Sequence, residues 1–210
     1  EQDLKMLSDQ GRKCFAVVAT AGTTVRGAID LIPELSKLCL HKNLWLHVDG
    51  AIGGVFGLVQ STSELVKGIG LADSVSLNPQ KLLGVAKSSS LLLVAKYFDL
   101  KSTFGTDMPY VEPVVGEEIH CGEIGLQGTR PADVLKLWLG MRQLGEEGIE
   151  SLLEGAINRR LYLQKMLDLS KFSLASGPLH LIAFTPKDVD KDFAFKWSVN
   201  TRKALLKKSF

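Results

Sequence analysis

The chain has 210 residues, enough for one domain or one domain and part of a second. Hydrophobic residues make up 45% and the formal net charge is +2, so the composition supports a packed core and excludes disorder. The near-neutral charge gives no reason to expect nucleic acid or an acidic membrane surface as a partner. No apolar run is long enough to span a membrane, and no basic-then-apolar leader opens the chain.

Three cysteines, Cys14, Cys39 and Cys121, are odd in number and lack the spacing of metal ligands. They are typical of reduced thiols and predict a cytoplasmic protein without a metal site. The chain starts without Met and inside a helix-like stretch, so we expect it to be a fragment.

Hydrophobic periodicity and turn residues predict an alternation of strands and helices. In chain order these are the end of a helix at Glu1–Gln10 closed at Gly11, a strand at Cys14–Ala19, a helix at Asp30–His41 with Pro33 in its first turn, a strand at Leu44–Val48 buried on both faces, a helix at Ser61–Ile69, strands at Ser74–Leu77 and Ser89–Ala95, helices at Pro131–Leu144 and Glu146–Leu169, a strand at Leu179–Phe184, and a helix at Asp192–Lys208. This order predicts an α/β fold with a mainly parallel sheet flanked by helices.

The region between Lys96 and Arg130 shows no sustained period and is predicted to be a long loop that is either functional or mobile. The long helix from Glu146 leads into a fresh strand and helix, which indicates the entry to a second domain. We therefore divide the chain into residues 1–145, the larger domain, and residues 146–210, a linking helix with part of a small domain.

Two charged residues follow predicted strands: Asp49 ends Leu44–Val48, and Lys81 comes just after the strand that ends at Leu77. Ligands of open α/β sheets bind where strands end. A carboxylate and an amine buried there need a shared partner, because unpaired buried charges are costly. Pyridoxal phosphate is a partner for both groups, since its aldehyde forms a Schiff base with lysine and its ring nitrogen pairs with a carboxylate.

Several blocks between about Phe15 and Leu139 carry a family resemblance. They are Ala19-Thr-Ala-Gly-Thr-Thr24, Asp30, His47-Val-Asp49, Ala51, Ala72-Asp-Ser74 and Asn78-Pro-Gln-Lys81. In order and spacing the chain resembles the group II pyridoxal-dependent amino-acid decarboxylases, which include the glutamate, cysteine-sulfinate, diaminobutyrate and aromatic amino-acid decarboxylases. The resemblance implies the fold of aspartate aminotransferase (type I), ending in part of a small α+β domain.

The resemblance implies that Lys81 forms the Schiff base, that Asp49 pairs with the pyridine nitrogen, and that Ala51 lies beneath the cofactor ring. Without the resemblance, Lys81 reads as a surface loop lysine and Asp49 as the N-cap of a helix. Gly50 stands where the family usually has alanine, a change we expect to be harmless.

Thr24 and Asp30 match a threonine and a supporting aspartate near the phenolic oxygen of the cofactor. Asp30 is also placed to cap the helix that begins there. His47 lies on the same strand face as Asp49 and either orients that carboxylate or is an ordinary core histidine.

Asn78 matches the phosphate-side asparagine of the family. Gln80 departs from the family, which usually has histidine directly before the lysine. A glutamine can still donate a hydrogen bond to phosphate, but it cannot act as an acid or a base.

Arg130 resembles the family's arginine ahead of the Lys-Leu-Trp-Leu helix, where it either binds the substrate carboxylate or forms a structural ion pair. It tilts the expectation toward acidic substrates. The family's mobile loop supplies a tyrosine that protonates the carbanion left by CO2. That position falls near His120, with Tyr110 the nearest tyrosine, and a histidine can serve as the acid.

The implied reaction is decarboxylation of an amino acid to an amine and CO2 in a homodimer with shared active sites. The family's phosphate loop and ring-stacking histidine are expected upstream of Glu1, so we expect the chain alone not to form an active enzyme. Two rivals stay open: another pyridoxal enzyme of this fold (an aminotransferase or a cysteine desulfurase) and a non-catalytic homologue. A nucleotide-binding domain is disfavoured, because no Gly-x-Gly-x-x-Gly follows a strand.

Overall fold

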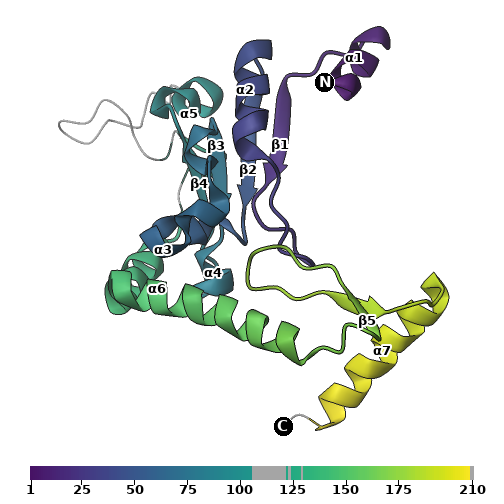
Figure 1. Ribbon diagram of the computed structural model, residues 1–210. Coiled ribbons are helices and arrows are strands. Elements are labelled where there is room, and N and C mark those ends of the chain that lie inside the picture. The colour runs from purple at the N-terminus through teal and green to yellow at the C-terminus, as the bar shows by residue number, and fades with distance from the viewer. Residues whose placement is uncertain (106–121, 123, 129, 209–210) are drawn as a thin grey trace.

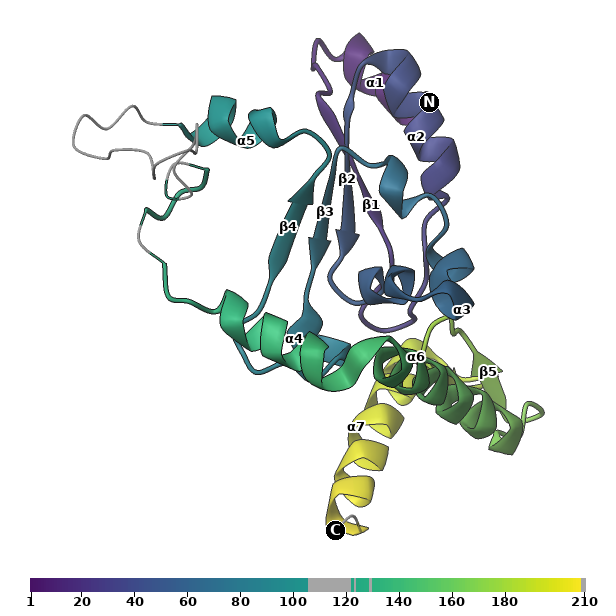
Figure 2. The same cartoon turned by 90° about the vertical axis from the view of Figure 1, so that its left-hand side faces the viewer.

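A four-stranded sheet forms the centre of the structure, a computed structural model that describes residues 1–105, 122, 124–128 and 130–208 (Figures 1 and 2). Its strands, in spatial order, are β1 (Ala16–Thr20), β2 (Trp45–Gly50), β3 (Ser74–Leu77) and β4 (Leu91–Val94). The first three run parallel and β4 is antiparallel to β3. The predicted α/β fold with a mainly parallel sheet is confirmed.

Helices connect and follow the strands. They are α1 (Gln2–Asp9), α2 (Ile32–Lys42), η1 (Gly54–Leu58), α3 (Gln60–Ser63), η2 (Glu64–Val66), η3 (Ile69–Leu71), α4 (Pro79–Leu82), α5 (Tyr97–Phe104), α6 (Val134–Met166) and α7 (Lys191–Lys208). Pro33 occupies the first turn of α2, as predicted. Helix α5 corrects the expectation of an unstructured stretch from Lys96. Among the described residues, no helix is long and apolar enough to cross a membrane.

The two faces of the sheet differ in burial. On one face Ala19, Leu46 and Val48 are fully or almost fully buried beneath α2 and the η1 region. On the other face Val18 is 64% and Trp45 36% exposed. The prediction that β2 is buried on both faces is therefore wrong. Within the described chain, side chains cover one face only, so burial alternates along the strand.

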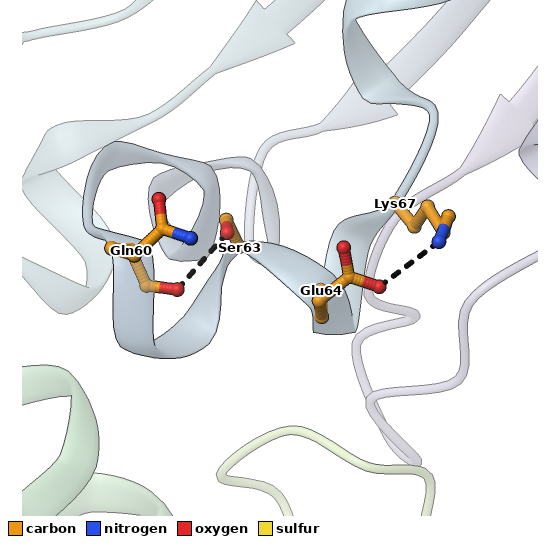
Figure 3. A network of polar contacts seen from close by, with 4 residues as sticks. All are labelled: Gln60, Ser63, Glu64 and Lys67. Atoms are coloured by element: carbon orange, nitrogen blue, oxygen red, sulfur yellow. Dashed lines mark hydrogen bonds and ion pairs between the residues drawn. The ribbon is translucent and has the colours of Figure 1, made fainter.

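The predicted helix at Ser61–Ile69 is instead three short pieces, α3, η2 and η3. Local polar contacts hold these turns: Ser63 Oγ donates to the Gln60 carbonyl oxygen at 3.1 Å, and Lys67 pairs with Glu64 at 3.2 Å (Figure 3). Gly68 has a φ of 86°, which a regular helix cannot contain. A Cβ at this glycine would lie 2.9 Å from Pro33 Cγ, so the close approach of α2 explains the break.

Helix α6 joins the sheet to the C-terminal segment. It is bent at Gly145, whose φ of 63° lies outside the helical region. Beyond the bend, Ile149, Leu153 and Ala156 pack into the main hydrophobic core. The bend falls at the boundary drawn between residues 1–145 and 146–210, a division that stays a prediction.

The C-terminal segment contains a small antiparallel sheet of β5 (Phe172–Leu174) and β6 (Phe184–Pro186), followed by α7. The predicted strand at Leu179–Phe184 is wrong over most of its length. Arg160 donates from Nη2 to the Pro178 carbonyl and from Nε to the Leu179 carbonyl, both at 3.0 Å. Leu179 itself is fully buried in the main core, so tertiary contacts pull this stretch out of the small sheet.

Candidate functional site

The carboxyl ends of β1, β2 and β3 meet at one edge of the sheet because the three strands are parallel. Figure 2 shows β2 and β3 running toward α4, with β4 running back in the opposite direction. Thr24 follows β1, Asp49 is the penultimate residue of β2, and Lys81 lies in α4 directly after β3. The fold thus brings the three predicted site residues to the same edge.

Asp49 is anchored at one carboxylate oxygen. Its Oδ1 accepts a hydrogen bond from the Ala51 backbone N–H at 3.0 Å and from Ser76 Oγ at 3.3 Å. Within the described part of the chain, its Oδ2 makes no hydrogen bond. The carboxylate is therefore held in place and still offers one oxygen to a cationic partner.

Asp30 holds the neighbouring strand end. Its Oδ2 accepts from the Thr20 backbone N–H at 2.7 Å, and its own N–H donates to the Thr20 carbonyl at 2.9 Å. Leu31, not Asp30, is the N-cap of α2, and no side chain caps that helix. The capping interpretation of Asp30 is wrong; the residue instead fastens Thr20, which lies opposite Asp49 in the sheet.

His47 belongs to a second polar group on the same open face. Its Nδ1 lies 2.8 Å from Ser74 Oγ, and Trp45 Nε1 donates to the same hydroxyl at 2.8 Å. Within the described residues His47 makes no hydrogen bond to Asp49. His47 therefore lies on the same strand face as Asp49, but its hydrogen-bond partner is Ser74.

Lys81 is exposed and makes no ion pair with Asp49 among the described residues. Asp49 is also exposed, so the expectation that both charges are buried is not met in this chain. The physical reason is that both side chains lie at the carboxyl ends of the strands, on a surface that no other described element covers. Asn78 caps the turn through its backbone, with the Lys81 N–H donating to its carbonyl at 2.9 Å.

The backbone packs closely at Gly50, directly after Asp49. A Cβ built on Gly50 would lie 2.9 Å from the Ser76 carbonyl oxygen and 3.1 Å from Gly54 Cα. In this chain a Cβ at position 50 would therefore force the neighbouring backbone to shift, and the expectation that glycine in place of the family's alanine is harmless stays a prediction.

Arg130 lies just before α6, near the start of β4. With Gln127 and the serines Ser88, Ser89 and Ser90 it lines a cavity of about 660 Å³ between the start of α6 and the start of β4. His120, together with Tyr110 and Cys121, lies outside the described residues.

Sequence reasoning missed Ser76 and Ser89, both of which contact predicted site residues. Strand alternation could have found Ser76, because it shares a face with Ser74 and Asn78. No sequence pattern pointed to Ser89, because its contact with Gln80 joins residues at the two ends of a loop.

Pyridoxal phosphate fits this set of residues. One carboxylate oxygen on Asp49 is available to a protonated ring nitrogen, an exposed lysine amine lies at the same sheet edge, and a small residue, Ala51, follows the aspartate. Figure 1 shows this edge of the sheet beside α4 and the first half of α6.

The fold and the strand-end residues together are those of a pyridoxal-phosphate-dependent enzyme. The sequence model described as the pyridoxal-dependent decarboxylase conserved domain matches residues 1–186. The chain belongs to this family.

Relatives and solved structures agree with this assignment. The chain is 35% identical to human cysteine sulfinic acid decarboxylase over 85% of this chain and 37% of that protein. It is 30% identical to the aromatic-L-amino-acid decarboxylase of Bacillus atrophaeus over 95% of this chain and 42% of that protein. The structure of mouse CSAD in apo form matches with a TM-score of 0.84 at 28% identity, covering 99% of this chain and 46% of that chain. The chain thus spans less than half the length of these relatives.

Proposed function

We propose that this chain forms part of an enzyme that decarboxylates an L-amino acid to its amine and CO2, with pyridoxal phosphate as cofactor and Lys81 as the Schiff-base lysine. The observation that carries the proposal is the convergence of Asp49 and Lys81 at one sheet edge in a chain of this family. When bound, pyridoxal phosphate supplies an aldehyde for the lysine and a cationic ring that takes up the electron pair left by CO2.

The chain's own residues take up the remaining roles. Asp49 holds the ring nitrogen protonated through the oxygen that Ala51 and Ser76 leave available. Thr24 and Asn78 contact the cofactor, with Gln80 on its phosphate side and Ala51 beneath its ring. His120 donates the proton that replaces CO2. The role of His120 rests on the resemblance alone, and the other assignments rest on the resemblance of the motifs and on their positions after the strands.

We assign the substrate carboxylate to Arg130, because a guanidinium binds carboxylate with two parallel hydrogen bonds. The cavity that it lines with three serines supplies further hydrogen-bond donors. The relatives are named as decarboxylases of cysteine sulfinic acid, acidic amino acids, aromatic amino acids and diaminobutyrate. We therefore propose an L-amino acid as the substrate without naming which one.

We also propose a homodimer in the cytoplasm. Support for the homodimer comes from an apolar face on the first half of α6, where Val134, Leu135, Trp138 and Leu139 are each more than half exposed. Support for the location comes from Cys14 and Cys39, which are free thiols in the described chain. Light scattering of the purified protein and fractionation of the cells that make it test the two points.

The central test is borohydride reduction of the complete protein with pyridoxal phosphate, followed by peptide mapping. We expect a pyridoxyl adduct on the peptide that contains Lys81, loss of that adduct in Lys81→Gln, and its retention in Lys67→Gln. Lys67 is a matched exposed lysine whose side chain is 70% accessible. Folded protein without an adduct at Lys81 contradicts the proposal and favours the non-catalytic homologue.

A screen of amino acids for release of CO2 follows a positive adduct. Amine and CO2 as products support a decarboxylase. A keto acid or released sulfur as product instead identifies the aminotransferase or desulfurase rival.

A further inference from the structure

The helix that carries Lys81 is too short to hold its own position. Helix α4 is a single turn, and its backbone bonds run from the Lys81 N–H to the Asn78 carbonyl at 2.9 Å and from the Leu83 N–H to the Pro79 carbonyl at 3.1 Å. A single turn fixes several dihedral angles for very few hydrogen bonds and is unstable by itself. The placement of Lys81 therefore depends on the contacts that α4 makes with its surroundings.

One such contact comes from the residue next to Lys81. The side-chain carbonyl Oε1 of Gln80 accepts a hydrogen bond from the Ser89 backbone N–H at 2.8 Å. Ser89 is only 6% exposed. A buried N–H that loses its partner carries the full cost of desolvation, so this bond fixes where residue 89 sits relative to α4.

The bond closes a bracing segment, residues 83–90, which runs from α4 to the start of β4. Leu83 and Val85 of this bracing segment are 5% and 7% exposed and belong to the main core. The bracing segment is therefore anchored at its beginning by apolar packing and at its end by the Gln80 side chain.

Helix α6 holds the bracing segment from the other side. Lys136 Nζ donates to the Lys87 carbonyl at 3.0 Å and pairs with Asp133 at 2.6 Å. A Cβ on Gly140 would lie 3.0 Å from Val85 Cγ2, so the helix backbone and the bracing segment are in close contact. Figure 2 shows α4 lying beside the first half of α6.

We propose that Gln80 is a positioning residue for Lys81, acting through the hydrogen bond by which its side-chain carbonyl fastens α4 to Ser89 of the bracing segment. The inference rests on the proposed role of Lys81 as the Schiff-base lysine. It adds a role as hydrogen-bond acceptor, which is distinct from a direct donor contact with the cofactor. An amide serves this role at every accessible pH, because it does not titrate.

Two substitutions separate the acceptor from the donor role. Gln80→Glu keeps an oxygen in reach of the Ser89 N–H and removes the amide donors, whereas Gln80→Met has similar length and removes both. Gln60→Met is the matched control, an exposed glutamine on α3. For each variant of the complete protein we would measure amide hydrogen exchange at Ser89 without cofactor, and the rate of Lys81 adduct formation with pyridoxal phosphate under borohydride.

Gln80→Met is expected to speed exchange at Ser89 by about fivefold, the loss of one ordinary hydrogen bond, and to slow adduct formation several-fold. Gln80→Glu is expected to recover the protection at Ser89 and part of the rate, because the carboxylate keeps the acceptor but lacks the amide donor on the phosphate side. Gln60→Met should match the unaltered protein in both measurements.

Three results would overturn the proposal. Unchanged exchange at Ser89 in Gln80→Met would show that the Gln80 side chain does not protect the Ser89 N–H. Faster exchange with unchanged adduct formation makes the contact structural only. Recovered protection in Gln80→Glu without recovered rate assigns Gln80 to a direct donor contact with the cofactor. An absence of adduct in the unaltered protein refutes the proposed function instead, and exchange at Ser89 still reports on the contact.

Discussion

Ser76 Oγ donates a hydrogen bond to Asp49 Oδ1 at 3.3 Å, between two residues that lie directly opposite each other in β3 and β2. The parallel register therefore places the hydroxyl and the carboxylate on one face at the carboxyl edge of the sheet. Together with the Ala51 N–H, this hydroxyl holds one carboxylate oxygen of Asp49 and leaves the other for the proposed cofactor.

Replacing Asp49 tests the role of its charge. Asp49→Asn keeps the size and the acceptor oxygen but cannot hold a ring nitrogen protonated. We expect turnover of the complete protein to fall by about two to three orders of magnitude, the scale of one lost electrostatic contact in an active site. Ser76→Ala should cost only several-fold, because a neutral hydrogen bond of this length is weak. Ser63→Ala, which removes an exposed hydroxyl of α3, is the control in the same turnover assay. Equal turnover in Asp49→Asn and unaltered protein contradicts the assignment.

The tight packing at Gly50 gives a prediction about stability. Gly50→Ala places a Cβ 2.9 Å from the Ser76 carbonyl oxygen, and backbone cannot move aside as a flexible side chain does. We expect the free energy of unfolding to fall by about 1–3 kcal/mol, measured by urea denaturation of the complete protein. Gly70→Ala is the control, since nothing lies within 4 Å of its Cβ position. A loss of equal size in both variants argues against the packing explanation.

The sheet was predictable from sequence because its strands are short apolar runs bounded by turn residues. Leu46 and Val48 supply the buried face of β2, and the chain order required parallel neighbours. The predicted strand at Leu179–Phe184 failed for the opposite reason. Its apolar residues suit either a strand or a buried connection, and Arg160, from a distant helix, decides between them.

At the site, sequence motifs identified the residues at the strand ends but not their supporting contacts. Asp49 and Lys81 were recognisable because they follow strands within ordered motifs. The bond from the Ser89 N–H to Gln80 depends on the path of a loop, which no local pattern encodes. The capping of α2 by Asp30 was predicted wrongly for a similar reason. A helix begins close by, but the chain turns its carboxylate back to the Thr20 N–H.

His180 predicts how stability depends on pH. Its ring stacks against Phe56 at a centroid distance of 5.9 Å, and its buried Nδ1 has no hydrogen-bond partner among the described residues. Burial, and then the charge of Arg159, lower the pKa of His180 below its ordinary value of 6.5. Between the lowered pKa and 6.5 the unfolded chain binds more protons than the folded chain, so stability rises with pH across this window.

We therefore expect the contribution of His180 to be fully present above a pH of about 6.5 and to be lost as the pH falls below it. His180→Phe keeps a ring against Phe56 and cannot titrate. The difference in unfolding free energy between this variant and the unaltered protein should grow in favour of the variant on acidification, as measured by urea titrations at a series of pH values. His41→Gln, which removes an exposed histidine of α2, is the control for loss of a histidine. A constant difference across the series contradicts the assignment.

Leu153 tests whether the second half of α6 stabilises the main core. This side chain is 0% exposed and packs in the same cluster as Val48 and Phe56 of the sheet region. Leu153→Ala removes buried methyl groups and leaves a cavity, so we expect a loss of about 2–5 kcal/mol in the free energy of unfolding. Leu163→Ala is the matched control on the same helix, where the side chain is 51% exposed. Its loss should stay below about 1 kcal/mol, because little apolar area is removed from the interior. If the two losses are equal, α6 does not belong to the core beyond Gly145. If only Leu153→Ala is destabilising, the helix beyond the bend and the sheet unfold as one unit.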